Sequence, residues 1–245
     1  MRTKPEKLKE LIKAGMPSTE QRALLWGIVS GSFQKKMNAN ANCETNNYYS
    51  HLLSIRHTVD SYILSEIEKD VTRTFPGHHL FETQEGQDKI QRILEAFAKR
   101  SEAVGYCQSM NFIAGMAILI MKNEEDAFWL LTSIVEDHCA GKYSRAMIEL
   151  QVDNLVLEDL LSEKLPELKV HMNRYSFDSL IVATKWFMCL FIGTLPTDTL
   201  LRIWDMFFLQ GPRVLFRAAI ALLILSKEDL LKSRDPSKFI KKYVK

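Results

Sequence analysis

Two short segments of this sequence combine residue types that could do chemistry. In the first, Asp70 and Arg73 stand three residues apart, shortly before Pro76-Gly77, a pair that should stop a helix. Ile67 and Val71 would share the buried face of this helix through their i,i+4 spacing. Asp70 and Arg73 could pair on the adjacent face. An arginine in the last turn of a helix is also favoured by the helix dipole, so this segment alone is explained by an ordinary solvated helix end.

The second segment runs from Gly105 to Asn111, with the sequence GYCQSMN, and precedes a strongly apolar stretch that ends at Met121. Polar amides on the first turn of a buried helix need partners, because an unsatisfied buried amide costs about 1–3 kcal/mol. Two interpretations stay open. Gln108 and Asn111 could cap or cross-link the core, or Gln108 could point outward, held rigid by the helix behind it, to orient a water or a phosphate.

Other kinds of catalytic or metal site have little support. The sequence has no Walker A loop, GxGxxG, HExxH or GxSxG motif. His78-His79 lacks a neighbouring carboxylate or cysteine to complete a metal site, so we expect a turn role. Cys107 as the nucleophile of an unrelated helical enzyme has no local base. The four cysteines are far apart, without zinc-ligand spacing, and we expect free thiols in a reducing compartment.

The elements that must position these segments are predicted to be helices. Ten glycines and seven prolines are few for 245 residues, since the two together average roughly 12% and β-sandwiches need frequent turns. The fold class is therefore all-α, as one contiguous domain. Between the helices, residues 34–47 are polar and asparagine-rich, and we expect a mobile loop there. The predicted helices cover residues 4–13, 18–31, 48–74 (one long or two consecutive helices), 87–100, a stretch ending at 121, 124–138, 144–164, 167–175, 179–193, 197–209 and 213–226.

The charge and hydropathy patterns restrict the partners. Thirty-two basic and 30 acidic residues give a formal charge of +2, too balanced for a dedicated nucleic-acid binder. The basic residues near both ends either lie on solvated helix faces or attract the chain weakly to an anionic membrane. We expect no signal peptide and no transmembrane segment, because Lys185 interrupts the longest apolar run. The expected location is cytoplasmic, with at most peripheral contact with endomembranes.

Four segments together resemble the TBC domain, the module of GTPase-activating proteins for Rab-family small GTPases. Around residues 105–115 and 128–131 the sequence is most similar to the growth hormone-regulated TBC protein subgroup. The resemblance implies one multi-helix TBC domain over residues 1–245, which could form two helical subdomains around a groove and could lack terminal helices at its C-terminus. The four segments are Gly15-Met16-Pro17 followed by Arg22 and Trp26, then Ile67-x-x-Asp70-x-x-Arg73, then Tyr106-x-Gln108, and finally Leu195-Pro196 followed by Arg202, Trp204, Asp205 and Gly211.

The resemblance implies that two side chains act in trans on a GTP-bound Rab, in vesicle trafficking. Arg73 would be an arginine finger that neutralises charge on the transferring γ-phosphoryl group, and Gln108 a glutamine finger that aligns the attacking water. The chain would need no cofactor of its own, because the GTPase carries GTP and Mg²⁺ and itself hydrolyses the nucleotide. Asp70, Tyr106 and Asn111 are candidates for supporting the fingers or contacting the GTPase.

Other residues also match the family pattern, and two positions depart from it. Arg22, Trp26, Arg202, Trp204 and Asp205 are expected to be structural. Ser109 stands where the family usually has glycine, and Phe112 where many members have aspartate. Because both finger motifs are intact, we expect an active GTPase activator, the alternative being a catalytically silent TBC-type GTPase-binding or scaffold module.

Overall fold

The computed structural model describes residues 10, 12–15, 18–177 and 179–235, which form helices, turns and loops and contain no β-strand. The predicted all-α class is thus confirmed. Most of the helix predicted over residues 4–13 lies outside the described residues, as does Met16-Pro17 of the first matched segment. The chain divides into two compact units, residues 1–145 and 146–245, and each is described by itself. No helix among the described residues is long and apolar enough to span a membrane.

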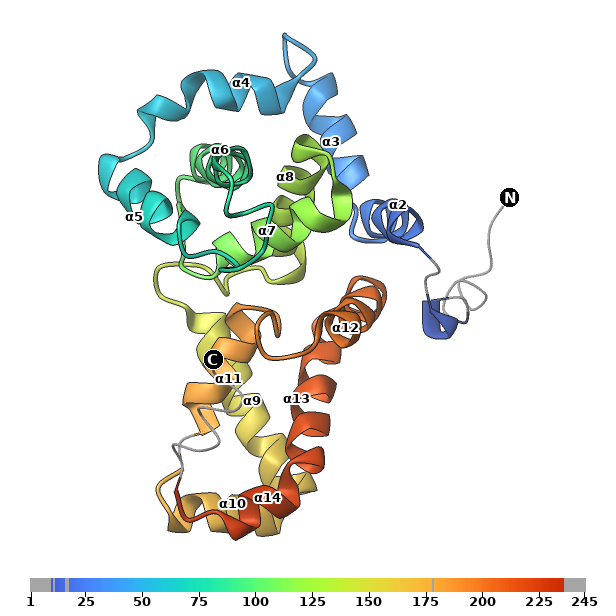
Figure 1. Ribbon diagram of the computed structural model, residues 1–245, viewed down its shortest axis with the longest axis vertical. Coiled ribbons are helices and arrows are strands. Elements are labelled where there is room, and N and C mark those ends of the chain that lie inside the picture. Colours follow the sequence, from blue (N-terminus) through green and yellow to red (C-terminus); the bar gives the residue numbers. More distant parts are fainter. Residues whose placement is uncertain (1–9, 11, 16–17, 178, 236–245) are drawn as a thin grey trace. The chain divides into compact units, whose positions relative to one another are not determined.

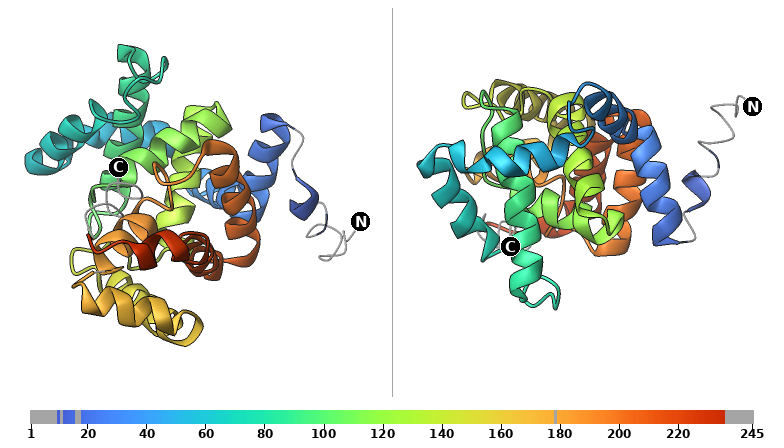
Figure 2. Two further views of the ribbon diagram at one scale, coloured as in Figure 1. Left: turned by 60° about the horizontal axis from the view of Figure 1, so that its bottom comes forward. Right: turned by 90° about the horizontal axis from the view of Figure 1, so that it is seen from above.

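The first unit is built around α6 (Gln84–Arg100). On one side of it lie α4 (Tyr48–Ile55), a 3₁₀ turn (Arg56–Thr58) and α5 (Ser61–Val71), and on the other lie α7 (Met110–Met121) and α8 (Glu124–Ser133) (Figure 1). The right-hand view of Figure 2 shows α6 along its length between these neighbours. Because α7 is apolar on nearly all sides, it is buried as a core helix. It therefore gives a rigid base to the segment in front of it.

Polar caps set several helix boundaries in this unit. Ser18 accepts a hydrogen bond from the backbone N–H of Gln21 at 3.2 Å, which begins α2 (Thr19–Val29) where the capping pattern predicts it. Asp60 caps α5 in the same way. The stretch 48–74 therefore consists of two helices rather than one. Thr83 caps α6 through the N–H of Gly86, so α6 begins three residues earlier than predicted.

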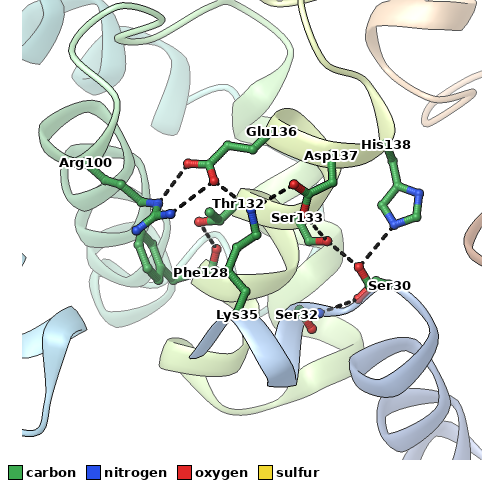
Figure 3. Close-up of polar contacts among 10 residues, drawn as sticks. All are labelled: Ser30, Ser32, Lys35, Arg100, Phe128, Thr132, Ser133, Glu136, Asp137 and His138. Atoms are coloured by element: carbon green, nitrogen blue, oxygen red, sulfur yellow. Dashed lines mark hydrogen bonds and ion pairs between the residues drawn. The ribbon is translucent and has the colours of Figure 1, made fainter. Parts of the chain in front are cut away.

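The prediction of a mobile loop over residues 34–47 is wrong, because α3 (Ser32–Ala41) occupies most of it. Helix α3 has a poor intrinsic helix propensity, but it packs against α8 and forms tertiary ion pairs. Lys36 pairs with Glu125 and Asp126, both at 2.9 Å. Lys35 lies between the carboxylates of Glu136 and Asp137, at 2.8 and 2.9 Å (Figure 3).

Figure 3 also shows why the end of α8 holds α3 and α6 together. A π-helical segment, Ile134–His138, continues α8 and carries Glu136. Arg100, at the end of α6, donates to Glu136 at 2.8 Å and lies over the rings of Tyr48 and Trp129. One carboxylate thus binds cations from two helices, and these contacts fix the framework of the first unit.

Within residues 146–177 and 179–235, the second unit has six helices: α9 (Ile148–Lys164), α10 (Pro166–Arg174), α11 (Ser179–Met188), α12 (Thr197–Gln210), α13 (Arg213–Leu225) and α14 (Lys227–Lys232). Helix α9 contacts α10, α11 and α13, and Figure 1 shows α10 and α14 side by side. Helix α14 is absent from the sequence-based prediction. Pro166 begins α10 at a first-turn position, and Pro196 and Pro212 are the N-caps of α12 and α13.

Candidate functional site

Arg73 lies on a tight turn beyond the end of α5 rather than in its last helical turn. The helix ends at Val71, five residues before Pro76, so the predicted stop at Pro76-Gly77 is too late. The Arg73 N–H still bonds to the carbonyl oxygen of Asp70, at 3.3 Å. The arginine side chain is 58% exposed. The turn therefore presents Arg73 to solvent.

Asp70 is buried, whereas the residues of an ordinary solvated helix end are exposed. Its side chain is 7% exposed, beside the buried Ile67 and Val71 that the spacing predicts. The Nε of Arg73 donates to Asp70 Oδ1 at 2.8 Å, and the Nη2 of Arg73 contacts the same oxygen. A guanidinium has five N–H donors, and within the described residues the outer ones of Arg73 have no partner. Asp70 holds one edge of the arginine and leaves the rest available to a ligand.

Tyr106 joins the second sequence segment to the first through the same carboxylate. Its hydroxyl donates to Asp70 Oδ2 at 2.5 Å, across 36 residues of sequence. Burial and the hydrogen bond to Asp70 raise the pKa of the Tyr106 phenol well above its ordinary value. The phenol therefore stays protonated and keeps donating to Asp70 at neutral pH. The structure thus brings Arg73, Asp70 and Tyr106 into one hydrogen-bonded group.

Asn111 supports the Arg73 turn from below. It is 1% exposed, and its Nδ2 donates to Thr74 Oγ1 at 2.8 Å and to the Asp70 carbonyl at 3.3 Å. The Thr74 hydroxyl donates to the same carbonyl at 2.7 Å. Of the roles predicted for Asn111, a core cross-link and support fit this burial, whereas direct contact with a partner protein does not.

Gln108 lies in the loop before α7 and is exposed. Within the described residues its side-chain amide makes no hydrogen bond, so it is available to an external group. The loop that carries it is confined at both ends. Gly105 has φ +64°, and a Cβ there would lie 3.0 Å from Ile63 of α5. Ser109, at the N-cap of α7, is largely buried and has φ +96°, a left-handed conformation that costs a non-glycine residue about 1–2 kcal/mol.

Aromatic packing holds the Arg73 turn against α7, a support that the sequence analysis missed. Phe75 stacks on Phe81 at 5.6 Å and meets the edge of Phe112 at 5.7 Å. A Cβ on Gly115 would lie 2.7 Å from the Phe75 ring, so glycine permits this close approach. Phe112 therefore has a packing role at its departure from the family pattern. The sequence signal that could have indicated this packing is Phe75 and Phe81 on either side of Pro76-Gly77, together with Phe112 shortly before Gly115.

The other predicted residues belong to helices α2 and α12. Arg22 and Trp26 are buried on α2. Trp204 of α12 is fully buried and donates to the carbonyl of Leu190 at 3.0 Å. Asp205 is also fully buried and accepts from Arg202 at 3.2 Å. These three residues of α12 belong to the second compact unit.

The histidine pair and the cysteines were the other candidates for metal binding or catalysis. His78 and His79 stack on each other at 4.7 Å, and His78 Nδ1 accepts from the N–H of Leu80 at 3.3 Å, which is a turn role. The four cysteines, all within the described residues, form no disulfide bond. Over the part of the chain that the structure describes, no three histidine, cysteine or acidic side chains are grouped to hold a metal ion.

Sequence comparison finds one family model and several curated relatives. The Rab-GTPase-TBC domain model matches residues 19–231, and so spans both compact units. Growth hormone-regulated TBC protein 1 of Xenopus tropicalis is 35% identical over 94% of this chain and 66% of its own length. TBC1 domain family member 2A of Mus musculus is 36% identical over 95% of this chain and 25% of its own length. The chain thus spans just under two thirds of the first relative and a quarter of the second.

Solved structures show the same similarity. The crystal structure of the Chlamydomonas flagellar RabGAP TBC domain matches with a TM-score of 0.86 and 34% identity, covering 99% of this chain and 79% of that one. The Ypt/Rab-GAP domain of Gyp1p matches with a TM-score of 0.79 and 19% identity, covering 97% and 84%. The second match concerns the fold alone.

Proposed function

Because the chain belongs to the Rab-GTPase-TBC domain family, we propose that it is a GTPase-activating protein for a GTP-bound Rab-family small GTPase. The observation that carries this proposal is the carboxylate of Asp70, which binds Arg73 from one motif and Tyr106 from the other. A single buried group thereby fixes the two segments that present an arginine and a glutamine to solvent.

Arg73 is proposed to act as the arginine finger. Its side chain is exposed, and the edge of the guanidinium on Asp70 restricts its orientation. A planar guanidinium can bridge several phosphate oxygens at once, which a lysine ammonium cannot do. Charge develops on the γ-phosphoryl group during GTP hydrolysis, and a positioned arginine stabilises it without having to reorganise. The bond to Asp70 lowers the entropic cost of placing the side chain.

Gln108 is proposed to align the attacking water. Its amide offers both a donor and an acceptor, which a water positioned for in-line attack requires. The Tyr106 hydroxyl bound to Asp70, two residues earlier, and α7, which begins two residues later, limit the motion of the loop. GTP and Mg²⁺ would come with the Rab, and the GTPase would break the phosphoanhydride bond.

A single-turnover GTP hydrolysis assay against a panel of Rab proteins tests this proposal. We expect acceleration of at least one Rab, with Arg73→Ala and Gln108→Ala each removing most of it. Lys69→Ala is a matched control, because Lys69 is an exposed cation on α5 that pairs with Glu66. GTP-dependent Rab binding without acceleration would support the silent binding module instead.

A further inference from the structure

The second compact unit contains an apolar groove between α9 and α13 that the proposed catalytic role does not use. Its walls are Val156 and Leu160 of α9 and Phe216, Ile220 and Ile224 of α13, and its volume is about 440 Å³. Val156 is 40% exposed and Ile224 is 53% exposed. Exposed apolar side chains that line a groove between two helices are the kind of surface that helix-in-groove recognition uses. We refer to this surface as the α9–α13 groove.

Three cations border the groove. Lys164 lies at the end of α9 and is already paired with Glu163 at 2.7 Å, whereas Arg213 and Arg217 lie on α13, in line with the apolar wall at Ile220 and Ile224. Within the described residues, none of those lining the groove is acidic. The surface is therefore apolar at its centre and positive at its edge.

The two arginines lack the partners that other arginines of this protein have. Arg213 donates to the backbone carbonyl of Gln210 and Arg217 to the side-chain oxygen of Gln210, both at 2.9 Å. Over the described ranges, neither pairs with a carboxylate. Arginines that do pair with carboxylates include Arg56, Arg73, Arg92, Arg100 and Arg202. Two exposed guanidinium groups without counter-ions beside an apolar groove provide charge complementarity for an acidic partner.

We propose that the α9–α13 groove binds an acidic amphipathic helix of a partner protein. Apolar side chains of such a helix, at i, i+4 and i+7, would enter the groove between the two helices. Carboxylates beside that apolar stripe would reach Arg213 and Arg217. Arginine suits this contact because its fork pairs with a carboxylate through two hydrogen bonds.

Charge and shape select this occupant over two others. Residues 236–245 contain four lysines and no acidic residue, and residues 1–9 contain four basic residues and one glutamate. Both terminal segments of this chain would therefore be repelled by the cations. A planar anionic membrane matches the charge but not the shape, because a flat bilayer contacts a protruding surface, whereas a concave groove accepts a ridge of side chains.

Fluorescence anisotropy on the whole 245-residue chain tests the proposal. The probe is a labelled helical peptide with leucines at i, i+4 and i+7 and glutamates on both flanks, and a second peptide has lysines in place of the glutamates. We expect the acidic peptide to bind at least about tenfold more tightly than the basic one, and to bind more weakly as salt is added. No GTPase is present, so this result is independent of the proposed catalytic function.

Substitutions assign the binding to the groove. Arg217→Glu and Ile224→Asp should each weaken binding of the acidic peptide by about tenfold. Val170→Asp and Lys232→Glu are matched controls, because both residues are exposed and lie outside the groove, and they should bind like the wild type. Equal binding of the two peptides, or unaltered binding by both groove variants, overturns the proposal. A second outcome would also overturn it: the chain binds neither peptide, but it binds vesicles of equimolar phosphatidylcholine and phosphatidylserine, and the groove variants abolish this vesicle binding.

Discussion

The hydroxyl of Tyr106 donates a 2.5 Å hydrogen bond to the buried carboxylate of Asp70. This bond connects the loop that carries Gln108 to the turn that carries Arg73, and it makes the geometry of the two proposed fingers interdependent. Tyr106 and Asp70 are therefore positioning residues in this account. A positioning residue should alter the catalytic rate more than the binding of the partner, and this can be measured.

Replacing Tyr106 by phenylalanine removes that bond and keeps the ring. We expect kcat for stimulated GTP hydrolysis to fall about tenfold, with little change in KM, because Arg73 and Gln108 lose their common anchor. The free energy of unfolding should fall by about 1–2 kcal/mol, since Asp70 Oδ2 loses a partner. Tyr62→Phe is the matched control, because Tyr62 is 71% exposed on α5. A larger effect on KM than on kcat would assign Tyr106 to partner binding instead.

Replacing Asn111 by aspartate should destabilise the turn below Arg73. The change removes the Nδ2 donor to Asp70 and Thr74 and puts a carboxylate in a position that is 1% exposed. We expect the free energy of unfolding to fall by about 2–4 kcal/mol, as measured by urea denaturation. The exposed Asn38 on α3 serves for comparison, and Asn38→Asp should change stability by less than about 0.5 kcal/mol. Equal effects at the two positions would contradict the support role.

Replacing Ser109 by glycine should stabilise the protein, because Ser109 has φ +96°. Glycine adopts this conformation without strain, although it adds entropy to the unfolded chain. We expect a net gain of about 0.5–1 kcal/mol in thermal or urea unfolding, with finger-dependent GTP hydrolysis retained. Ser54→Gly, within α4, should instead lose about 0.5–1 kcal/mol. A loss at Ser109 would mean that its side chain contributes more than its backbone strain costs.

Acid should weaken the contact that holds α3 and α6 together at Glu136. Burial alone would raise the pKa of Glu136, but the hydrogen bonds from Arg100 and Lys35 outweigh it and hold the pKa below its ordinary value. A lowered pKa in the folded state contributes stability above the unfolded-state value of about 4.3, and this stability is lost as the pH falls through the lower folded-state pKa. The destabilisation caused by Glu136→Gln should therefore shrink as the pH is lowered from neutral to below 4.

Urea unfolding of the wild type and of Glu136→Gln across this pH range measures the effect. Glu163→Gln is the comparison, because Glu163 forms an exposed ion pair with Lys164, which should contribute little. A Glu136→Gln difference that is constant with pH would show that the ion pairs of Glu136 do not stabilise the fold.

Residue spacing and capping patterns within single helices made much of the fold predictable. The i,i+4 relation of Ile67 and Val71 placed them on the buried face, and the i,i+3 relation of Asp70 and Arg73 gave their ion pair. The Ser18 capping pattern located the beginning of α2. Each of these depends on neighbours within one helical turn, which a sequence displays directly.

Contacts between distant segments were not predictable. Nothing local to Asp70 indicates that Tyr106, 36 residues away, bonds to it. Helix α3 has a polar, asparagine-rich sequence, and its ion pairs are with distant carboxylates such as Glu136, 101 residues from Lys35. The burial of Asn111 likewise follows from packing of the Arg73 turn on α7. The roles of Arg73 and Gln108 in hydrolysis stay predictions, because they concern a partner protein.

The most direct test of the central claim is the single-turnover rate of GTP hydrolysis by an accelerated Rab, with wild-type chain and with Arg73→Lys. An arginine finger contributes about 10³–10⁵-fold in the Ras system, and lysine cannot reproduce its planar fork. We expect Arg73→Lys to lose nearly all acceleration while its binding to the GTP-bound Rab persists. Acceleration by Arg73→Lys at the wild-type rate would contradict this expectation.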